Sequence, residues 1–358
     1  MANDYHAINL SQGFPNFPID EKLQSLLEQK TKENVHQYAP MAGLPALTEE
    51  ICNLTFKHYK REIDASKNVL ITAGATQAIF TTIQALIHPG DEVIILDPSY
   101  DCYESPIILA GGKPIRIPLG ENFLPDWDLI REVTCSKTKI IITNNPHNPS
   151  GAVWKKEDLH ELEHLVIDYP NLLVLSDEVY EYITFEHAHL SANSSEILKN
   201  RSIVVSSFGK TFHITGWKIG YIIAPENILN EIKKVHQFLV FCVNSPAQHT
   251  LAAYLKETNV NTLGSFYQEK RDYFHELMKN SRFDLLPSEG TYFQLASYKQ
   301  ISNENDIAFT KKLVVEHGVA TIPLSVFNAN GEDRKLIRFC FAKDNDTLKQ
   351  AAEKLCKI

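Results

Sequence analysis

Short apolar runs alternate with stretches of helical periodicity between about residue 68 and residue 225. The apolar runs that have the length of buried strands lie at residues 69–72, 92–96, 139–143, 172–175 and 202–205. Strands that alternate with helices build βαβ units, in which helices cover both faces of a parallel sheet. The pattern therefore predicts an α/β fold with a large, doubly wound and mostly parallel sheet.

The chain changes character after about residue 260. A charged helical stretch around residues 267–271 is followed by a strand-like run at residues 336–341, which predicts a second, smaller α+β lobe. The first thirty-odd residues do not follow the βαβ pattern, so they either pack with this lobe or cross to a partner subunit. We expect a large domain at residues 36–260 and a small domain made of residues 1–35 together with residues 261–358.

Polar side chains follow two of the predicted strands. Asp177 and Tyr180 come after the run at residues 172–175, and Lys210 comes after the run at residues 202–205. In open parallel sheets, ligands bind outside the carboxyl ends of the strands. Lysine is rarely buried unless it is paired or used, and one established use is a Schiff base with an aldehyde. A lysine that binds an aldehyde and an aspartate that faces a ring nitrogen suit pyridoxal 5'-phosphate (PLP).

Two other segments suit anions. The turn that begins at Gly74 stands between a predicted strand and a helix, where free backbone N–H groups bind phosphate, although most such turns bind nothing. Arg338 interrupts an apolar alternation near the C-terminus. Its partner is either an internal carboxylate or a substrate carboxylate, which a planar guanidinium binds through two hydrogen bonds. The residues alone leave both readings open.

Three short motifs suggest other chemistry. Residues 208–211 imitate the end of a P-loop, but that motif needs a glycine where Val204 stands. The glycines within residues 216–220 have the wrong spacing for a dinucleotide fingerprint. His160 and His164 form an H-E-x-x-H match, the signature of a zinc metallopeptidase. The segment has the periodicity of a crossover helix whose apolar positions face the sheet, so we favour solvated histidines and keep zinc as a remote alternative.

Composition bears on partners and location. The 358 residues are 44% hydrophobic and 22% charged, which is ordinary for a globular protein, and the net charge of −9 argues against a nucleic-acid partner. The six cysteines show no C-x-x-C pair, which favours free thiols in a reducing compartment, most simply the cytoplasm. No secretory signal and no run of membrane-spanning length is evident, so we expect neither secretion nor membrane insertion.

Six motifs occur in the order seen in fold-type I PLP-dependent aminotransferases of class I/II, which the chain resembles over nearly its whole length. They are residues 74–78, 97–100, 148–151, 176–180, 207–210 and Arg338. Residues 11–15, 37–41 and 323–327 look most like methionine aminotransferases and kynurenine aminotransferases. The resemblance implies the PLP-transferase fold type I and transamination between an L-amino acid and a 2-oxo acid by a ping-pong mechanism. Methionine is the expected donor, with aromatic amino acids or kynurenine as further donors.

The resemblance also implies a role for each matching position. Lys210 would form an aldimine with PLP, Asp177 would pair with the pyridine nitrogen, and Tyr180 with Asn148 would contact the ring hydroxyl. Tyr100 would stack on the ring. The groups implied for the phosphate are the turn at Gly74, the backbone of Ala75 and Thr76, Ser207, Lys218, and Tyr38 of the partner subunit. Those implied for the substrate carboxylate are Gly13, Asn148 and Arg338. Shared active sites of this kind imply a homodimer.

Some positions depart from the broader family. Relatives more often have arginine where Lys218 stands; lysine keeps the charge without the two-pronged geometry. Kynurenine-type relatives have aromatic and histidine residues where this chain has Phe241 and Cys242, which favours an apolar and moderately roomy pocket. A PLP-dependent cysteine-conjugate β-lyase, which expels a leaving group from Cβ, is the alternative function. A PLP-binding transcriptional regulator is disfavoured because no basic N-terminal domain is expected.

Overall fold

The computed structural model describes residues 1–358, and its largest element is a seven-stranded sheet in the order β2-β8-β7-β6-β5-β3-β4. Only β8 runs antiparallel to its neighbours. The strands are β2 (Val69–Thr72), β3 (Glu92–Asp97), β4 (Lys113–Pro118), β5 (Thr138–Asn144), β6 (Leu173–Asp177), β7 (Ser202–Ser207) and β8 (Gly220–Ile223). All five strands expected in this region lie in the sheet, so the prediction of a doubly wound, mostly parallel sheet is confirmed.

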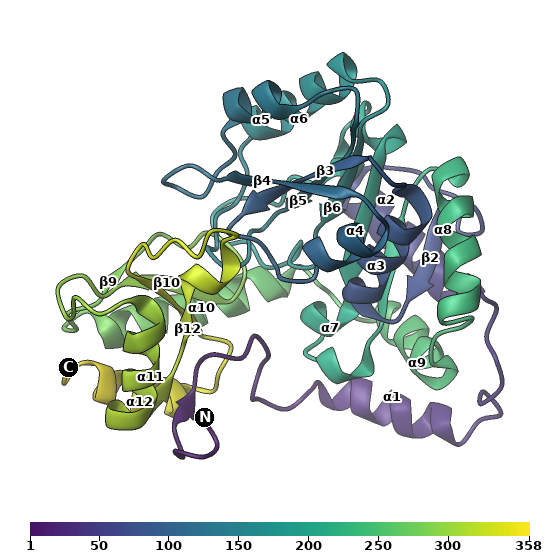
Figure 1. Cartoon of the computed structure of the whole chain (residues 1–358). Coiled ribbons are helices and arrows are strands. Elements are labelled where there is room, and N and C mark those ends of the chain that lie inside the picture. Colours follow the sequence, from purple (N-terminus) through teal and green to yellow (C-terminus); the bar gives the residue numbers. More distant parts are fainter.

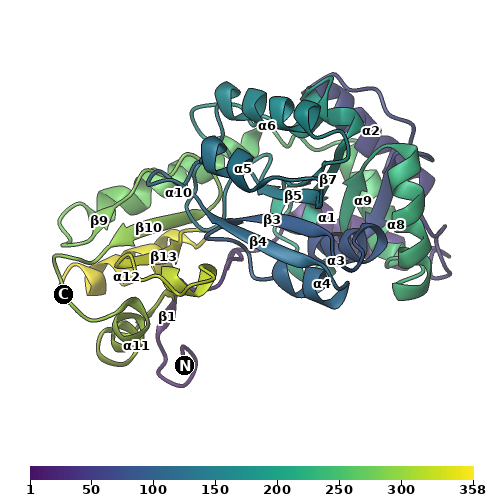
Figure 2. The ribbon, with the colours of Figure 1, turned by 45° about the horizontal axis from the view of Figure 1, so that its top comes forward.

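Helices cover both faces of this sheet (Figure 2). They are α2 (Pro45–Tyr59), α3 (Gly74–Leu86), α4 (Glu104–Leu109), α5 (Trp127–Val133), α6 (Lys156–Asp168), α8 (Glu226–Leu239) and α9 (Ser245–Leu255). Successive strand residues point to opposite faces. Ile94 of β3 therefore lies in the core that includes α5 and α6, and Ile95 lies in the core that includes α3 and α8. Both faces are buried, which explains the unbroken apolar runs in the sequence.

A second lobe is built on a four-stranded antiparallel sheet and has its own hydrophobic core (Figure 1). Its strands, in spatial order, are β12 (Ile322–Pro323), β13 (Leu336–Cys340), β10 (Phe293–Ser297) and β9 (Asp284–Leu285), and its helices are α10 (Thr262–Met278), α11 (Asp306–His317) and α12 (Asn345–Leu355). Near the N-terminus, β1 (Ile8–Asn9) pairs with β11 (Val319–Ala320) of this lobe, whereas α1 (Glu21–Thr31) packs on α9. The domain boundaries at residues 36 and 260 stay a prediction.

The shorter elements connect these parts. They are α7 (Phe208–Thr211) and the 3-10 helices η1 (Ala192–Ser194), η2 (Leu198–Asn200), η3 (Thr215–Trp217) and η4 (Leu324–Phe327). None of the helices is both long and apolar enough to cross a membrane. All six cysteines are free thiols.

Arg116 of β4 fastens the end of β3 to the second lobe. Its guanidinium donates to both carboxylate oxygens of Asp97, at 2.6 to 3.0 Å, and to the carbonyl of Phe327 at 3.3 Å. The backbone N–H of Ser99 donates to the same carbonyl at 2.9 Å. The loop that follows β3 is thereby held between the two lobes, and this loop carries Tyr100.

Candidate active site

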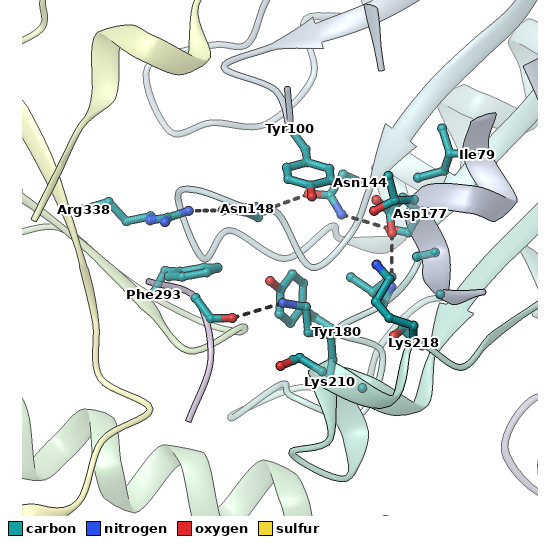
Figure 3. Close-up of a pocket in the computed structure, with 18 residues that line it drawn as sticks. Ile79, Tyr100, Asn144, Asn148, Asp177, Tyr180, Lys210, Lys218, Phe293 and Arg338 are labelled. Atoms are coloured by element: carbon teal, nitrogen blue, oxygen red, sulfur yellow. Dashed lines mark hydrogen bonds between the residues drawn. The ribbon is translucent and has the colours of Figure 1, made fainter. Parts of the chain in front are cut away.

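A cavity of about 290 Å³ lies at the carboxyl ends of the parallel strands, beside the second lobe (Figure 3). Every residue with a predicted cofactor or substrate contact except Tyr38 lines it: Gly13, Gly74, Ala75, Thr76, Tyr100, Asn148, Asp177, Tyr180, Ser207, Lys210, Lys218 and Arg338. They come from the carboxyl ends of five strands (β2, β3, β5, β6 and β7), the segment before β8, the N-terminal segment and β13. The structure thus brings together residues that are up to 325 positions apart in the chain, as Gly13 and Arg338 are.

Lys210 stands in α7, directly after β7, and its side chain enters the cavity. The preceding Phe208 is buried against Phe212 and Tyr221, which anchors the short helix to the core. The amine of Lys210 donates to the carbonyl of Gly13 at 3.1 Å. Burial lowers its pKa to about 8, since the charged form loses solvation. A larger fraction of this amine is neutral near pH 7 than of a lysine on the surface.

Asp177 ends β6 and is only 3% exposed. The hydroxyl of Tyr103 donates to its Oδ2 at 2.6 Å, and Asn144 donates to its backbone carbonyl at 3.0 Å. Burial raises the pKa of Asp177 to about 6, whereas the bond from Tyr103 acts in the opposite direction. A cationic ring N–H placed beside this carboxylate would favour its charged form.

The first turn of α3 and Lys218 form an anion site. Gly74 has φ +76°, a conformation that suits glycine, and the side chain of Lys218 lies 3.3 Å from the position of a Cβ on Gly74. A Cβ on Gly220 would lie 3.0 Å from the backbone N of Ala75, so glycine there lets β8 pack closely against α3. The first N–H groups of a helix lack partners within the helix, and an adjacent ammonium adds charge. Both features favour a bound phosphate.

Arg338 of β13 is 7% exposed and faces the cavity from the second lobe. Its Nη atoms donate to Asn148 Oδ1 at 2.7 Å and to the carbonyl of Ser11 at 3.1 Å, while its Nε has no partner. The guanidinium carbon lies 3.9 Å from the ring centroid of Phe293. None of these partners is a carboxylate, so the internal salt bridge that the sequence left open is not formed. A buried cation without a counter-ion is costly unless a ligand supplies one.

Two tyrosines contribute aromatic surface. Tyr100 lines the cavity and meets Tyr103 edge-on, with ring centroids 5.9 Å apart. Tyr180 is buried, and burial raises the pKa of its phenol, which therefore stays protonated near neutral pH. Together with Asn148, these groups could contact a flat ring and its polar substituents.

The donor and acceptor set fits PLP. The cavity offers an amine for an aldehyde, a buried carboxylate for a pyridine nitrogen, an aromatic face and a phosphate site at a helix N-terminus. The arginine lies apart from the phosphate site and remains available for a substrate carboxylate. The roles implied for the individual residues stay predictions.

Tyr38 lies outside the cavity of its own chain and is 80% exposed. Its ring meets that of Phe241 edge-on at 5.2 Å. Neither Phe241 nor Cys242 lines the cavity of this single chain. The roles predicted for these three residues stay predictions.

Sequence reasoning missed several groups at the site. Tyr103 binds Asp177, and Asn144 donates to the backbone carbonyl of Asp177 and accepts from the backbone N–H of Asn148. Tyr292 contacts Lys210, and Phe293 lies against Arg338. Most of these contacts join distant parts of the chain. No local pattern marks them, except that Asn144 belongs to the polar cluster at the end of an expected strand.

The H-E-x-x-H segment lies in α6, as expected for a crossover helix. Leu162 and Val166 are buried, and His160 and His164 are exposed. His160 bonds Glu163 at 3.0 Å, and no group of three or more potential metal ligands occurs in the chain. The structure does not favour a zinc site here.

Comparisons with known proteins agree with this geometry. The model of the family "Aminotransferase class I and II" matches residues 5–355. Methionine aminotransferase of Escherichia coli is 45% identical over 100% of this chain and 94% of its own length, and a kynurenine–oxoglutarate transaminase of Dictyostelium discoideum is 32% identical over 100% and 92%. A solved E. coli structure described as having a methionine aminotransferase function superposes with a TM-score of 0.97 at 45% identity, covering 100% of this chain and 94% of that one. N-succinyldiaminopimelate aminotransferase of Mycobacterium tuberculosis superposes with a TM-score of 0.94 at 32% identity, covering 99% and 94%.

Proposed function

The chain belongs to the class I and II aminotransferase family, and we propose that it transfers the amino group of methionine to a 2-oxo acid, with PLP bound through Lys210. The predicted family and fold type I are confirmed, and the protein is an aminotransferase. PLP dependence follows from the family. The choice of methionine rests on the relatives and on the cavity.

One observation carries the proposal. Arg338, without any carboxylate partner, shares a cavity with the amine of Lys210, whose pKa is lowered, and with the buried carboxylate of Asp177. An amino acid carries a carboxylate and an amine on one carbon, so Arg338 can hold the first while the second reaches the position of Lys210. The two hydrogen-bonding edges of a guanidinium then fix the orientation of the substrate.

Each group of the chain has a physical task in this reaction. When bound, PLP supplies an acceptor for the electron pair left as the substrate Cα–H bond breaks. Asp177 favours a protonated ring nitrogen, which strengthens that acceptor. With PLP bound, Lys210 would take the proton from Cα through its nitrogen lone pair and deliver it to the cofactor's aldehyde carbon. Its lowered pKa brings this base close to the working pH.

The lining of the cavity supports an apolar amino donor. Ile79, Val179 and Phe293 line it beside the polar groups, and Arg338 is the one arginine among the lining residues. A second carboxylate, as in aspartate, would lack a second guanidinium. Methionine is the proposed donor, with aromatic amino acids and kynurenine next.

We also propose a homodimer in which Tyr38 of the partner subunit reaches the phosphate. Tyr38 is 80% exposed and contacts Phe241, which is 44% exposed, and adjacent exposed aromatic rings of this kind are typical of a surface that a partner covers. We propose the cytoplasm as the location, because six free thiols suit a reducing compartment.

Steady-state kinetics with a panel of amino donors and 2-oxo acids tests the proposed donor. Double-reciprocal plots of initial rate against donor concentration, at several concentrations of the 2-oxo acid, should give parallel lines. The value of kcat/KM should be highest for methionine and much lower for aspartate. Turnover of aspartate but of none of the proposed donors would contradict methionine as the donor. A reaction of a cysteine conjugate that releases pyruvate without any added 2-oxo acid would instead indicate β-lyase chemistry.

A further inference from the structure

Tyr292 had no predicted role, yet its hydroxyl lies against the amine of Lys210. The amine is 2.9 Å from the hydroxyl of Tyr292 and 3.1 Å from the carbonyl of Gly13, and the hydroxyl is 2.6 Å from the same carbonyl. The three polar atoms form a closed triangle at the cavity wall. Tyr292 directly precedes β10, so the amine of Lys210, which follows β7 of the large sheet, is held by one group of the second lobe and one of the N-terminal segment.

The protons in this triangle can be assigned. A carbonyl oxygen only accepts, so the single proton of the phenol goes to Gly13. Burial keeps that proton in place, because it raises the pKa of Tyr292 well above its ordinary value. The phenol oxygen then accepts a hydrogen bond from Lys210. The charged form of the amine therefore has two acceptors, the oxygens of Gly13 and Tyr292.

Packing fixes the triangle in space. Tyr292 is 0% exposed, and its ring meets those of Tyr180, Phe293 and Tyr267 at centroid distances of 5.3, 4.9 and 5.5 Å. A Cβ on Gly13 would lie 2.8 Å from the ring of Phe293, so glycine lets this segment approach closely. Both acceptors are thus rigid, whereas the four-carbon stem of lysine is flexible.

We propose that Tyr292, together with the carbonyl of Gly13, is a positioning residue that holds the free amine of Lys210 while this amine carries the proton. This inference rests on the proposed function, in which the amine is released whenever substrate is bound. A released lysine that is free to rotate spends little time near the reacting carbon. The two acceptors restrict it to one wall of the cavity and stabilise its protonated form after it has taken the proton.

Other ionisable groups also act on this amine. Those near it are Asp177 on β6, Tyr180 after β6, Lys218 after η3, and Arg338 and Cys340 on β13. A change confined to the hydroxyl of Tyr292 leaves all of them in place. The consequence of that change is therefore specific: the charged amine loses one acceptor, and the pKa of Lys210 falls.

Tyr292→Phe and Tyr267→Phe form a matched pair of variants. Each removes one buried phenolic hydroxyl and keeps the ring, but the hydroxyl of Tyr267 has no hydrogen-bond partner. The PLP-free protein is labelled with trace acetic anhydride between pH 6 and 11, and acetylation of Lys210 is quantified by mass spectrometry. This titration needs no turnover. The pH at which acetylation of Lys210 is half-maximal is expected to be about one unit lower in Tyr292→Phe than in the wild type, and unchanged in Tyr267→Phe.

The PLP-loaded proteins give the second readout, with methionine carrying deuterium at Cα. Tyr292→Phe is expected to lower kcat about tenfold, to increase the deuterium isotope effect on kcat and to leave KM nearly unchanged. An unchanged labelling midpoint in Tyr292→Phe, or an equal shift in Tyr267→Phe, would overturn the positioning role. A wild type that labels at Lys210 but does not turn over methionine would contradict the proposed donor, and the labelling result would still decide on Tyr292.

Discussion

At the scale of single residues, the site depends on buried charges that the protein itself leaves incompletely paired. Arg338 has only neutral partners, and Lys210 is bound to two neutral oxygens. Arg338 therefore favours a bound anion, and Lys210 favours a bound anion or its neutral form. Lys210 and Arg338 could be singled out from the sequence because a charged residue next to an apolar run is unusual. Tyr103 and Tyr292 could not, since each acts through a partner far away in the chain.

Replacing Arg338 by lysine should separate geometry from charge. The variant keeps the cation but loses the two-pronged contact and the face of Phe293, so KM for methionine should rise roughly 10- to 100-fold with a smaller change in kcat. Arg334→Lys is the matched control, because Arg334 also lies over a phenylalanine ring, that of Phe123, outside the cavity. Equal effects of the two substitutions on KM would argue against a carboxylate clamp.

Lys210 should also make the stability of the PLP-free protein depend on pH. Its pKa is about 8 in the folded state and near 10.5 when unfolded, so the unfolded chain binds more protons between these values. The contribution of Lys210 to the free energy of unfolding therefore rises with pH across this window. Lys210→Met should be more stable than the wild type at pH 7, by up to about 3 kcal/mol, and the difference should shrink at pH 10. Urea unfolding at both pH values measures this; a difference that does not depend on pH would contradict the lowered pKa.

At the scale of elements, the apolar runs predicted the buried strands and their ends predicted the cavity. Two strands of the large sheet were not predicted. The edge strand β4 contains two prolines and exposed positions, and Gly220 interrupts the apolar run that forms β8, so neither stretch reads as a continuous buried strand in the sequence. The strands β1, β9, β11 and β12 have only two residues each, too few for a period to be recognised, and β1 pairs with β11 from the opposite end of the chain.

Gly220 tests how β8 supports the phosphate site. A Cβ there would lie 2.7 Å from the carbonyl of Ser206 and 3.0 Å from the backbone N of Ala75. Gly220→Ala should therefore displace the first turn of α3, destabilise the protein by about 1 to 3 kcal/mol and weaken PLP binding. Gly216→Ala is the control, because nothing lies within 4 Å of a Cβ at that position. Urea unfolding and PLP titration of both variants test this prediction. Equal stability and equal PLP affinity in the two variants would mean that the close packing of β8 against α3 is unimportant.

At the scale of the whole molecule, the cavity is assembled from segments that are far apart in the chain. Lys210 and Asp177 come from the large sheet, Arg338 from the second lobe and Gly13 from the N-terminal segment. The order of the motifs in the sequence indicated this assembly only through the family resemblance. Tyr38 remains outside, and the proposed homodimer gives it a function.

Mixed dimers test whether active sites are shared between subunits. Lys210→Ala and Tyr38→Ala each impair every site in their own homodimers. In a hybrid of the two chains, one site combines Lys210 of the Tyr38→Ala chain with Tyr38 of the Lys210→Ala chain. A hybrid purified through two different tags should regain about half of the wild-type activity at limiting PLP. A hybrid no more active than the mean of the two homodimers would contradict shared sites.

The visible absorption spectrum tests the central claim most directly. The purified protein is incubated with PLP, desalted, and measured before and after addition of methionine without a 2-oxo acid. We expect a yellow absorption band that is lost on addition of methionine and that does not form in Lys210→Ala. A band that methionine leaves unchanged would contradict the proposal that methionine is the amino donor. Absence of the band in the wild type, or a normal band and normal turnover in Lys210→Ala, would contradict the assignment of Lys210 and with it the whole account.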